Sequence, residues 1–534
     1  MRKIAIVGAG PTGIYTLYWL LKLKAPFAAT LYEQADRAGV GMPYSHEENS
    51  RMMLANIASI EIPPLLSTYI DWLNEQSEAH LARYGVRRDS LHVRQFLPRL
   101  LLGEYFRDQF LGLLTLAQTQ GVQVTLRESC EVTDLQACAD GVRLWAQGEA
   151  VAERVDLAVI ATGHVWPAEE KSTRSYFPSP WSGLMDACIP ACTVGVMGTS
   201  LSGLDASMAV VAQHGHFVES ADQPLRFRLN ADSAALKVVL MSRSGILPEA
   251  DFYCPIPYEP LSVFTQQALE TAIAAGQTGL LDRIFRLIIA EIDNADPRWS
   301  ASIALPTLNA DSFSDAWFRV RREHDPFHWA QANLEEVERN KRRKYTVPWR
   351  YAILRLHEAV QDVVPHLDEQ DSQRFKTGLA RVFIDNYAAI PSESIRRLLA
   401  LREAGLIDIL ALGEDYQKVI KEDKTVITTP EASHTFDLFI DARGQKALKT
   451  KDLPFPTLRE QLQATGEDIP EVGDDYTLQE PAAARGRVAF AALPWLLHDR
   501  PFVQGITASA EMGEAIARAI VQPSRRRRLL HPGL

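Results

Sequence analysis

The 534-residue sequence predicts an α/β protein with two parallel sheets and a helix-rich insertion. Three observations predict this class. Two apolar runs, at 3–7 and 193–198, each enter a glycine-containing turn and then a helical pattern. Two further runs, VDLAVIATGH and FDLFIDARGQ, each end in small residues. The stretch from 260 to 375 is rich in helical periodicity. Strands that alternate with helices are typical of parallel sheets.

The first strand–helix–strand unit opens the chain. Residues 3–7, KIAIV, form a short β-branched run typical of a buried parallel strand. This run enters GAGPTG, where Gly8, Gly10 and Gly13 have the spacing G-x-G-x-x-G. A helical pattern, IYTLYWLLKLK, follows, and then a second strand, ATLY, that ends at Glu33. A strand, glycine turn, helix, second strand and acid in this order indicate a dinucleotide-binding fold of the Rossmann type.

Each part of this loop has a physical role. Gly8 allows the tight turn, Gly10 lets the backbone approach a pyrophosphate, and Gly13 permits close packing of helix on strand. The helix N-terminus turns its free N–H groups and positive dipole end toward the phosphates. Glu33 is placed to accept hydrogen bonds from the adenosine ribose hydroxyls. The cofactor contacts predicted for this loop are Gly8, Gly10, Pro11, Thr12, Gly13, Glu33 and Gln34.

A later strand exit completes this fold. VDLAVIATGH places a buried strand against Ala161, Thr162 and Gly163, and small residues there let the backbone pass close to a ligand. We predict that all three contact the cofactor. The chain before this strand contains an amphipathic helix at 96–119 and short strands around a turn signal at Asp140–Gly141.

The second glycine turn, GTSLSG, departs from the pattern of the first. Gly198, Ser200 and Gly203 keep the 1-3-6 spacing, but serine stands where the backbone approaches a pyrophosphate most closely. Serine adds one small side chain, and its hydroxyl can hydrogen-bond a phosphate oxygen. Asp205, inside the following helix, is expected to pack or cap locally. We predict a weak, transient NADPH or NADH site, with an empty vestigial fold as the rival interpretation.

The strand after this turn, KVVLMSRSG, ends near Arg243. An arginine at the end of this strand is the candidate for binding the 2′-phosphate of NADP. The alternative is a surface arginine in a turn.

These units divide the chain into two dinucleotide-binding folds, of which the first is discontinuous. The predicted divisions are the N-terminal part of the first fold at 1–175, an NAD(P)-binding-like domain at 190–255, a helical insertion at 256–375, a return to the second fold at 376–430, the C-terminal part of the first fold at 431–522 and a basic tail at 523–534. The tail run Arg525–Arg528 is interpreted as a solvated, disordered end.

Composition narrows the function classes. A net charge of −11 argues against nucleic-acid binding, and no stretch reaches the ~18 apolar residues of a membrane span. Five cysteines without a zinc or dithiol spacing are expected to be reduced thiols, which favours a cytoplasmic protein. No histidine falls in a metal-binding motif, and we predict no metal site. The sequence does not indicate an oligomeric state.

Several other segments carry a family resemblance: Gly41–Ser45 (GMPYS), Met53–Asn56 (MLAN), Tyr69–Leu73 (YIDWL), Arg99 and Gly103–Tyr105 (GEY), continuing through SRSGILPEADFY, IPSESIRRLLALREAG and FVQGITASAEMGEA. With the glycine loops, they resemble the bacterial FAD/NAD(P)-binding family that includes the enterobacterial protein YdhS. The resemblance implies that the first loop holds FAD and the second NAD(P)H. It places Gly41–Asn56 along the flavin, with Gly41, Met42, Tyr44 and Asn56 as contacts. A buried turn is the alternative interpretation of its last part, MMLAN at 52–56.

The family is similar, more distantly, to flavin-dependent N-monooxygenases that hydroxylate amino-acid amines. That similarity implies an FAD-dependent oxidoreductase, reduced by NAD(P)H, that passes electrons to an acceptor or hydroxylates a small polar substrate with oxygen. Two alternatives are a flavin-binding sensor or scaffold without turnover, and an oxidase or dehydrogenase without a nicotinamide step. No residue is singled out as catalytic, because in flavoenzymes the cofactor carries the hard chemistry.

The C-terminal part departs from related flavoproteins, which end in a strand and a Gly-Asp whose carboxylate binds the flavin chain. Here AFAALPW offers Ala491–Leu493 and no acid, so backbone N–H groups around Pro494–Leu496 and Gln504–Gly505 would take its place.

Other conspicuous residues have ordinary explanations. His164 is a candidate ligand contact that is more often a packing residue, and Cys254 is interpreted as a loop thiol. Arg350 and Arg355 could recognise a carboxylate, but surface or salt-bridge roles are favoured. The tryptophans of the middle segment are expected to form a packed helical core: Trp299, Trp317, Trp329 and Trp349.

Overall fold

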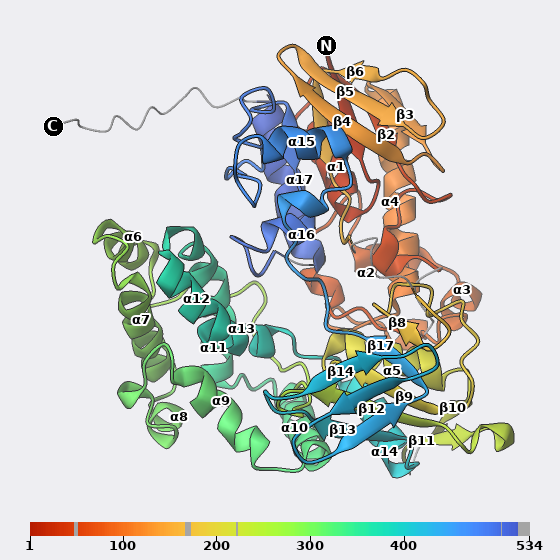
Figure 1. Cartoon of the computed structure of the whole chain (residues 1–534), viewed down its shortest axis with the longest axis vertical. Coiled ribbons are helices and arrows are strands. Elements are labelled where there is room, and N and C mark those ends of the chain that lie inside the picture. Colours follow the sequence, from red (N-terminus) through yellow and green to blue (C-terminus); the bar gives the residue numbers. More distant parts are fainter. Residues whose placement is uncertain (47–51, 166–171, 221–222, 504, 522–534) are drawn as a thin grey trace.

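A computed structural model of the chain describes residues 1–46, 52–165, 172–220, 223–503 and 505–521. It contains two five-stranded parallel sheets and a unit made of helices. Figure 1 shows the first sheet, with the N-terminus, at the top, the second sheet at the bottom and the helical unit at the left. The predicted α/β class with two nucleotide-binding folds and a helix-rich insertion is confirmed.

The first sheet has the strand order β18-β7-β1-β2-β3. Its strands are β1 (Arg2–Val7), β2 (Phe27–Tyr32), β3 (Gln123–Arg127), β7 (Leu157–Ile160) and β18 (Val488–Phe490). Every neighbouring pair is parallel. β1 lies at the centre because KIAIV is apolar, and its residues from Ile4 to Val7 are buried.

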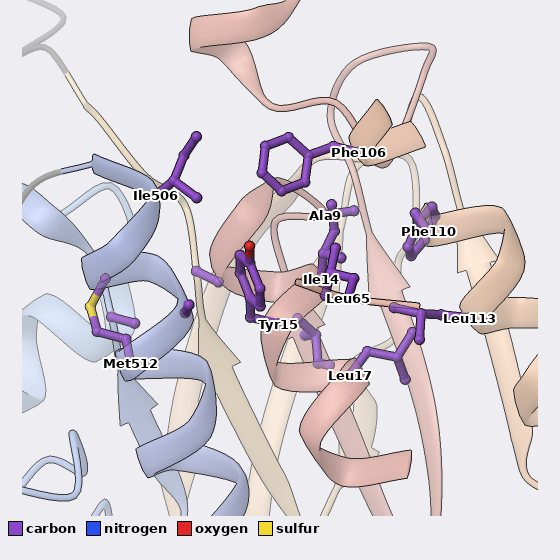
Figure 2. Packing of buried hydrophobic residues seen from close by; sticks show 14 of the residues in the cluster. Ala9, Ile14, Tyr15, Leu17, Leu65, Phe106, Phe110, Leu113, Ile506 and Met512 are labelled. Carbon is purple, nitrogen blue, oxygen red and sulfur yellow. The ribbon is translucent and has the colours of Figure 1, made fainter. Parts of the chain in front are cut away.

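Three helices cover this sheet: α1 (Pro11–Lys22), α4 (Arg99–Thr119) and α17 (Gly505–Val521). α4 begins later than predicted, at Arg99, because Pro98 occupies the position before its first turn. α1 packs on α17 at Gly513, where an added Cβ would lie 2.7 Å from the backbone nitrogen of Thr16. Figure 2 shows Tyr15 of α1 between Phe106 and the α17 side chains, in one apolar core that joins the two ends of the chain.

The second sheet has the order β13-β12-β9-β17-β8. Its strands are β8 (Tyr176–Phe177), β9 (Thr193–Met197), β12 (Lys237–Ser242), β13 (Ile407–Ala411) and β17 (Leu438–Asp441). All of its pairs are parallel. This order repeats that of the first sheet, with β9 in the place of β1, β12 in that of β2 and β17 in that of β7. α5 (Leu201–Val211) follows β9 as α1 follows β1.

A three-stranded antiparallel sheet precedes β7 in the first fold and β17 in the second. In the first fold it consists of β4 (Val132–Cys138), β5 (Gly141–Ala146) and β6 (Glu153–Val155), and in the second of β14 (Gln417–Ile420), β15 (Thr425–Thr428) and β16 (Ser433–Phe436). The predicted turn at Asp140–Gly141 joins β4 to β5. The polar stretch after α5 forms a hairpin of β10 (Gly215–Ser220) and β11 (Gln223–Leu229).

The helical unit has its own apolar core. Its helices are α6 (Gln266–Ala274), α7 (Leu280–Ala295), α8 (Pro297–Ser302), α9 (Phe313–Arg322), α10 (Pro326–Arg343), α11 (Pro348–Gln361), α12 (Glu369–Thr377) and α13 (Leu379–Tyr387). Trp299 stacks on Trp349 with centroids 4.4 Å apart, and Trp317 packs edge-on against both, as a packed core requires. Trp329 lies apart from them and donates to Glu249.

The remaining helices lie outside the helical unit. They are α2 (Tyr69–Glu75), α3 (Glu78–Ala82), α14 (Ser392–Glu403), α15 (Pro456–Gln463) and α16 (Leu493–Leu496). No helix in the described ranges is long and apolar enough to cross a membrane.

The sheet pairing corrects three predicted boundaries. β8 pairs with β17, so the second fold begins by Tyr176 and not at 190. The helical insertion extends beyond 375, to the end of α13 at Tyr387. Strand β17, which the 431–522 division gives to the first fold, pairs with β9 in the second sheet. FDLFIDARGQ is therefore the counterpart of VDLAVIATGH and not a part of the same fold. The tail at 523–534 lies outside the described residues.

Candidate nucleotide-binding sites

The first glycine loop connects β1 to α1 in the geometry that its sequence predicts. Gly8 has a φ of +103°, and an added Cβ there would lie 2.3 Å from the Ala161 carbonyl oxygen. A Cβ on Gly13 would lie 2.2 Å from the Gly8 carbonyl oxygen. Gly10 precedes the first helical turn, which Pro11 opens. The N–H groups of this turn have no partner inside the helix and are directed outward from its N-terminus.

Glu33 braces this loop from the end of β2. Its carboxylate accepts the N–H of Ala9 at 3.1 Å and the N–H of Ala35 at 3.0 Å. Burial raises the pKa of Glu33, although these two N–H groups act to lower it. Gln34 is exposed beside it. Glu33 therefore adjoins the loop, where a ribose bound at the end of the strand would meet its carboxylate.

The segment after β2 lies against the same loop. Gly41 has a φ of +84°, and an added Cβ there would lie 2.7 Å from Cδ of Pro11. Met42 and Tyr44 follow in a short 3₁₀ turn, and burial raises the pKa of Tyr44 to about 12. The structure thus brings this part of the predicted flavin segment to the glycine loop. Residues 47–51 of the segment lie outside the described residues.

The later part of the segment, Met52–Asn56, contacts both folds. The Met53 side chain belongs to the apolar core of the second fold. Arg99 donates from Nε to the Leu54 carbonyl at 3.1 Å, and its Nη2 lies 2.6 Å from Asp205 Oδ2 in α5. Both side chains of this ion pair are nearly buried, and burial raises the pKa of Asp205 although Arg99 opposes it. Asp205 therefore joins the two folds, where local packing or capping was expected. Asn56 is exposed and lines a cavity of about 1000 Å³.

The second glycine loop repeats the backbone of the first. Gly198 has a φ of +133°, and an added Cβ would lie 2.7 Å from the Ala442 carbonyl oxygen. A Cβ on Gly203 would lie 2.2 Å from the Gly198 carbonyl oxygen, the same distance as in the first loop. Ser200 takes the place of Gly10 before the helix, is exposed, and makes no capping bond within the described part of the chain.

Hydrogen-bond register identifies which residue of the second fold replaces Glu33. Gly8 donates its N–H to Tyr32, and Gly198 donates its N–H to Met241. The residue after Tyr32 is Glu33, so its counterpart is Ser242, and Arg243 is the counterpart of Gln34. The Ser242 Oγ accepts the N–H of Gly245 at 3.0 Å, as the Glu33 carboxylate accepts that of Ala35.

Arg243 is exposed on the second fold and pairs loosely with Glu414, with Nη1 3.3 Å from Oε2. Its side chain is 65% exposed, so it can reorient toward a ligand at the end of β12. No acid stands at the Ser242 position, and a phosphate there would meet a hydroxyl and a guanidinium instead of a carboxylate. This arrangement suits a 2′-phosphate better than a free ribose hydroxyl.

The strand exits of the two folds contact each other. Ala161, Thr162 and Gly163 follow β7, and Ala442–Gly444 follow β17 in the same relation to their loop. Gln445 Nε2 donates to the Val165 carbonyl at 2.8 Å, and the Val165 N–H donates to Gln445 Oε1 at 3.2 Å. The sequence repeat VDLAVIATGH/FDLFIDARGQ was the signal for this contact, but Gln445 itself was not predicted.

His164 lies at this contact. Burial lowers the pKa of its imidazole, and a hydrogen bond with Gln445 acts in the opposite direction. A neutral ring at the junction can accept or donate a hydrogen bond without bringing a charge into it.

Other predicted residues have structural partners. Burial in the protein opposes the charge of Glu249, but Arg350 and Arg321 lower the pKa of this carboxyl to about 2, so Arg350 has the salt-bridge role that was favoured. Arg355 donates to the carbonyls of Glu259 and Pro260. Burial raises the pKa of the Cys254 thiol to about 12, which makes it an unreactive thiol.

The C-terminal part supplies a strand and a short helix beside the first loop. Ala491 donates its N–H to Ile160 at the end of β7, and α16 follows at once. Ala491–Leu493 thus follow β18 at the carboxyl edge of the first sheet. Gln504 lies outside the described residues.

Comparisons with known proteins agree with this fold. Residues 5–165 match a family described as FAD-NAD(P)-binding, and residues 265–387 match one described as the YdhS-like middle domain. The protein YdhS of Escherichia coli (strain K12) is 66% identical over 528 residues, which cover 99% of both chains. The ornithine N-hydroxylase of Kutzneria sp. 744, solved with reduced FAD, NADP⁺ and L-ornithine, has a TM-score of 0.51 at 14% identity. The reduced ornithine hydroxylase PvdA of Pseudomonas aeruginosa has a TM-score of 0.50 at 13% identity.

Each of the two hydroxylase structures covers 98% of this chain and 99% of its own, and at this identity the likeness concerns the fold. The two loops, their strand order and the first family match define a two-fold FAD/NAD(P)-binding protein. The identity to the Escherichia coli protein and the middle-domain match are more particular. The chain belongs to the YdhS family.

Proposed function

We propose that the protein is an FAD-dependent oxidoreductase whose flavin is reduced by NADPH that binds transiently at the second loop. The observation that carries this proposal is the contact of the two strand exits at Val165 and Gln445. β7 is parallel to β1 and β17 is parallel to β9, so the carboxyl ends of both sheets face this junction. Ligands of open α/β sheets bind at the carboxyl ends of the strands, and two nucleotides would therefore meet here.

The residues of the first loop fit FAD. The N-terminus of α1 would bind the pyrophosphate, and Glu33 would accept the ribose hydroxyls. Gly41–Tyr44 would lie along the flavin, since Gly41 contacts the loop at Pro11. Bound FAD would supply two-electron transfer between a nicotinamide nucleotide and an acceptor.

The residues of the second loop would bind and orient the reductant. The N-terminus of α5 and the Ser200 hydroxyl would hold the phosphates, and Arg243 with Ser242 would hold the 2′-phosphate. A serine in place of the second glycine weakens close approach of the pyrophosphate, which suits a nucleotide that must leave after each turnover.

Neighbouring structures support the oxygen-dependent form of this chemistry, because the two hydroxylases share the fold along the whole chain. We propose a monooxygenase that acts on a small polar substrate. Two alternatives are a dehydrogenase or oxidase without a nicotinamide step and a flavin-binding sensor without turnover. In either of them, NADPH would not reduce the flavin.

Anaerobic titration of the purified protein tests the proposal. Its visible spectrum should show bound flavin near ~450 nm, and NADPH should bleach this band faster than NADH. A protein that takes up no FAD contradicts the whole proposal. Flavin that neither nucleotide reduces contradicts the NADPH step and leaves the sensor, or an oxidase that its own substrate reduces.

A further inference from the structure

The strand exit of the second fold carries charges at a place where that of the first fold carries none. The ladder register aligns the two exits. Ile160 pairs with Val7, the last residue before the first loop, and Asp441 pairs with Met197, the last residue before the second. Asp441 is therefore the counterpart of Ile160, which is apolar and fully buried.

Arg443 differs from its counterpart in the same way. It lies two residues after the strand end, as Thr162 does in the first fold. The glycine that follows has a positive φ in both folds, +84° at Gly444 and +67° at Gly163, so the backbones of the two exits are alike. An aspartate and an arginine thus replace an apolar residue and a threonine, beside the loop in which Ser200 replaces a glycine.

The Asp441 carboxylate accepts hydrogen bonds from two cations. Arg443 donates to it from Nε at 2.8 Å and from Nη2 at 2.6 Å, and Lys418 of β14 donates from Nζ at 3.1 Å. Burial opposes the charge of Asp441, but these two cations lower the pKa of its carboxyl. Among the described residues, no other carboxylate forms an ion pair with either cation. One positive charge therefore stays without a counter-charge.

The two cations differ in how far they are exposed. Lys418 also donates to the Tyr176 hydroxyl at 3.1 Å, and its side chain is 20% exposed. The Arg443 side chain is 41% exposed, and its Nη1 has no hydrogen-bond partner in the part of the chain that the structure describes. Lys418 is therefore sufficient to pair Asp441 within the fold, whereas Arg443 keeps N–H groups for a ligand.

We propose that Arg443, held by Asp441, binds the diphosphate bridge of the nicotinamide nucleotide. The inference rests on the proposed function and adds a contact to those of the α5 N-terminus and Arg243. An arginine held through Nε and Nη2 has its remaining N–H groups in a fixed direction, which suits a phosphate oxygen. It also supplies attraction that the second loop needs, because serine in place of glycine hinders the closest approach of the backbone.

The strand order is the reason for choosing the diphosphate. β12, which ends near Arg243, and β17, which ends before Arg443, lie on opposite sides of β9 and its loop. A nucleotide whose adenosine half lies toward β12 has its diphosphate at the loop and its other half toward β17. Ala442, the residue before Arg443, contacts the loop: a Cβ added to Gly198 would lie 2.7 Å from its carbonyl oxygen. Arg443 therefore begins about one strand spacing, ~4.8 Å, from the diphosphate position.

Isothermal titration calorimetry of the FAD-loaded protein tests the proposal with NADP⁺, NAD⁺ and ADP. All three nucleotides carry a diphosphate, and only NADP⁺ carries the 2′-phosphate. The test variant is Arg443→Thr, which copies the first fold at this position and leaves Lys418 to pair with Asp441. We expect it to weaken the binding of all three nucleotides by the same factor, about tenfold. Arg243→Ala should weaken the binding of NADP⁺ alone.

Two further variants separate nucleotide binding from structure. Arg443→Lys keeps the charge without the planar fork, so its affinities should lie between those of Arg443→Thr and the wild-type protein. Arg402→Ala is the matched control, because Arg402 has a similar exposure, 43%, and pairs with Asp408 of β13 at the far edge of the same sheet. This control should leave all three affinities unchanged.

Unchanged affinities in Arg443→Thr would overturn the proposal, as would a loss confined to NADP⁺ or an equal loss in Arg402→Ala. If this variant bound ADP normally and the other two nucleotides weakly, the contact would lie beyond the diphosphate and the assignment would be wrong. Failure of the proposed function gives a different result, because the wild-type protein would then bind neither NADP⁺ nor NAD⁺. Failure of this inference alone leaves wild-type binding intact.

Discussion

The two glycine loops, at 8–13 and 198–203, can be compared atom by atom. In both loops the first glycine has a positive φ, and a Cβ added to it would lie against an alanine carbonyl oxygen. A Cβ added to the third glycine would lie 2.2 Å from the carbonyl oxygen of the first glycine. Around this common backbone the side chains differ. The first fold has Gly10 and Glu33, and the second has Ser200 and Ser242 in the same places.

This difference separates two kinds of requirement. The first and third glycines are needed to pack a helix against a strand, whether or not a nucleotide binds, because any Cβ would collide with backbone. The second position and the strand-end residue touch no backbone so closely: a Cβ on Gly10 would lie 3.3 Å from Gly41 Cα. These two positions are therefore free to vary with the ligand.

The largest expected effect is at Gly10. Gly10→Val should fold, because its φ of −82° suits any residue, but its side chain would occupy the approach of the pyrophosphate. We expect a colourless protein, as measured by absorbance near ~450 nm after purification.

Ser200→Val is the matched variant in the second loop. It should keep FAD and lose reduction by NADPH. Loss of flavin from this variant too would mean that the two loops do not serve separate nucleotides.

The second effect concerns the ion pair between the folds. Arg99→Ala leaves Asp205 nearly buried without its cation and releases the Leu54 carbonyl, so we expect a loss of about 3–5 kcal/mol in the free energy of unfolding. Urea unfolding measures this loss. Arg99→Met/Asp205→Leu should recover most of the stability, because an apolar pair of similar size fills the space without a stranded charge.

If the double variant were as unstable as Arg99→Ala, the Leu54 contact and not the charge would be the important interaction. Flavin reduction by NADPH should slow in both variants, since the flavin segment loses its tie to the second fold.

The sequence predicted the loops more completely than it predicted what connects them. Gly8, Gly10, Gly13 and Glu33 follow one another within a short stretch, and their spacing alone implies the turn that the structure contains. Arg99 and Asp205 are distant in sequence and belong to different folds, so no local pattern could pair them. Asp205 was accordingly expected to act within its own helix.

The same reason explains the misplaced strand. FDLFIDARGQ has the pattern of a last strand in either fold, and pattern alone does not say which sheet it joins. Ladder pairing of β17 with β9 decides this. The cavity that Asn56 lines was also beyond prediction, because its wall combines residues such as Gln95, Lys341 and Asn386, which are far apart in the sequence.

The third effect concerns Arg243, which distinguishes the second loop from the first. Arg243→Ala should raise the KM for NADPH about ten- to a hundredfold and leave NADH nearly unchanged, because a charge-assisted bond to the 2′-phosphate contributes about 1.5–3 kcal/mol. Steady-state oxidation of both nucleotides measures this.

Ser242→Glu should copy the first loop and shift preference toward NADH, since a carboxylate repels the 2′-phosphate and accepts ribose hydroxyls. Glu414→Gln serves as the control, because it removes only the loose partner of Arg243. Equal effects on both nucleotides would contradict the assignment of Arg243.

The smallest expected effect is a dependence of FAD binding at the first loop on pH. The second loop lacks this dependence, because it has Ser242 where the first has Glu33. Burial raises the pKa of Glu33 in the folded protein. FAD needs the carboxylate form, because protonation removes an acceptor for the ribose. The Kd for FAD should therefore increase as pH falls through this raised pKa, at most tenfold per pH unit, and fluorescence titration from pH 7 downward measures it.

The unfolding of the apoprotein should depend on pH in the opposite direction. A carboxyl whose pKa is raised by folding contributes stability that is complete below its unfolded pKa and is lost as pH rises through its folded pKa. Acid thus favours the folded apoprotein at Glu33 while it weakens FAD binding at the same residue. Glu33→Gln should remove both dependences together. If either persisted in this variant, another group would carry it, and the brace that Glu33 gives to Ala9 and Ala35 would be structural and not a part of the binding site.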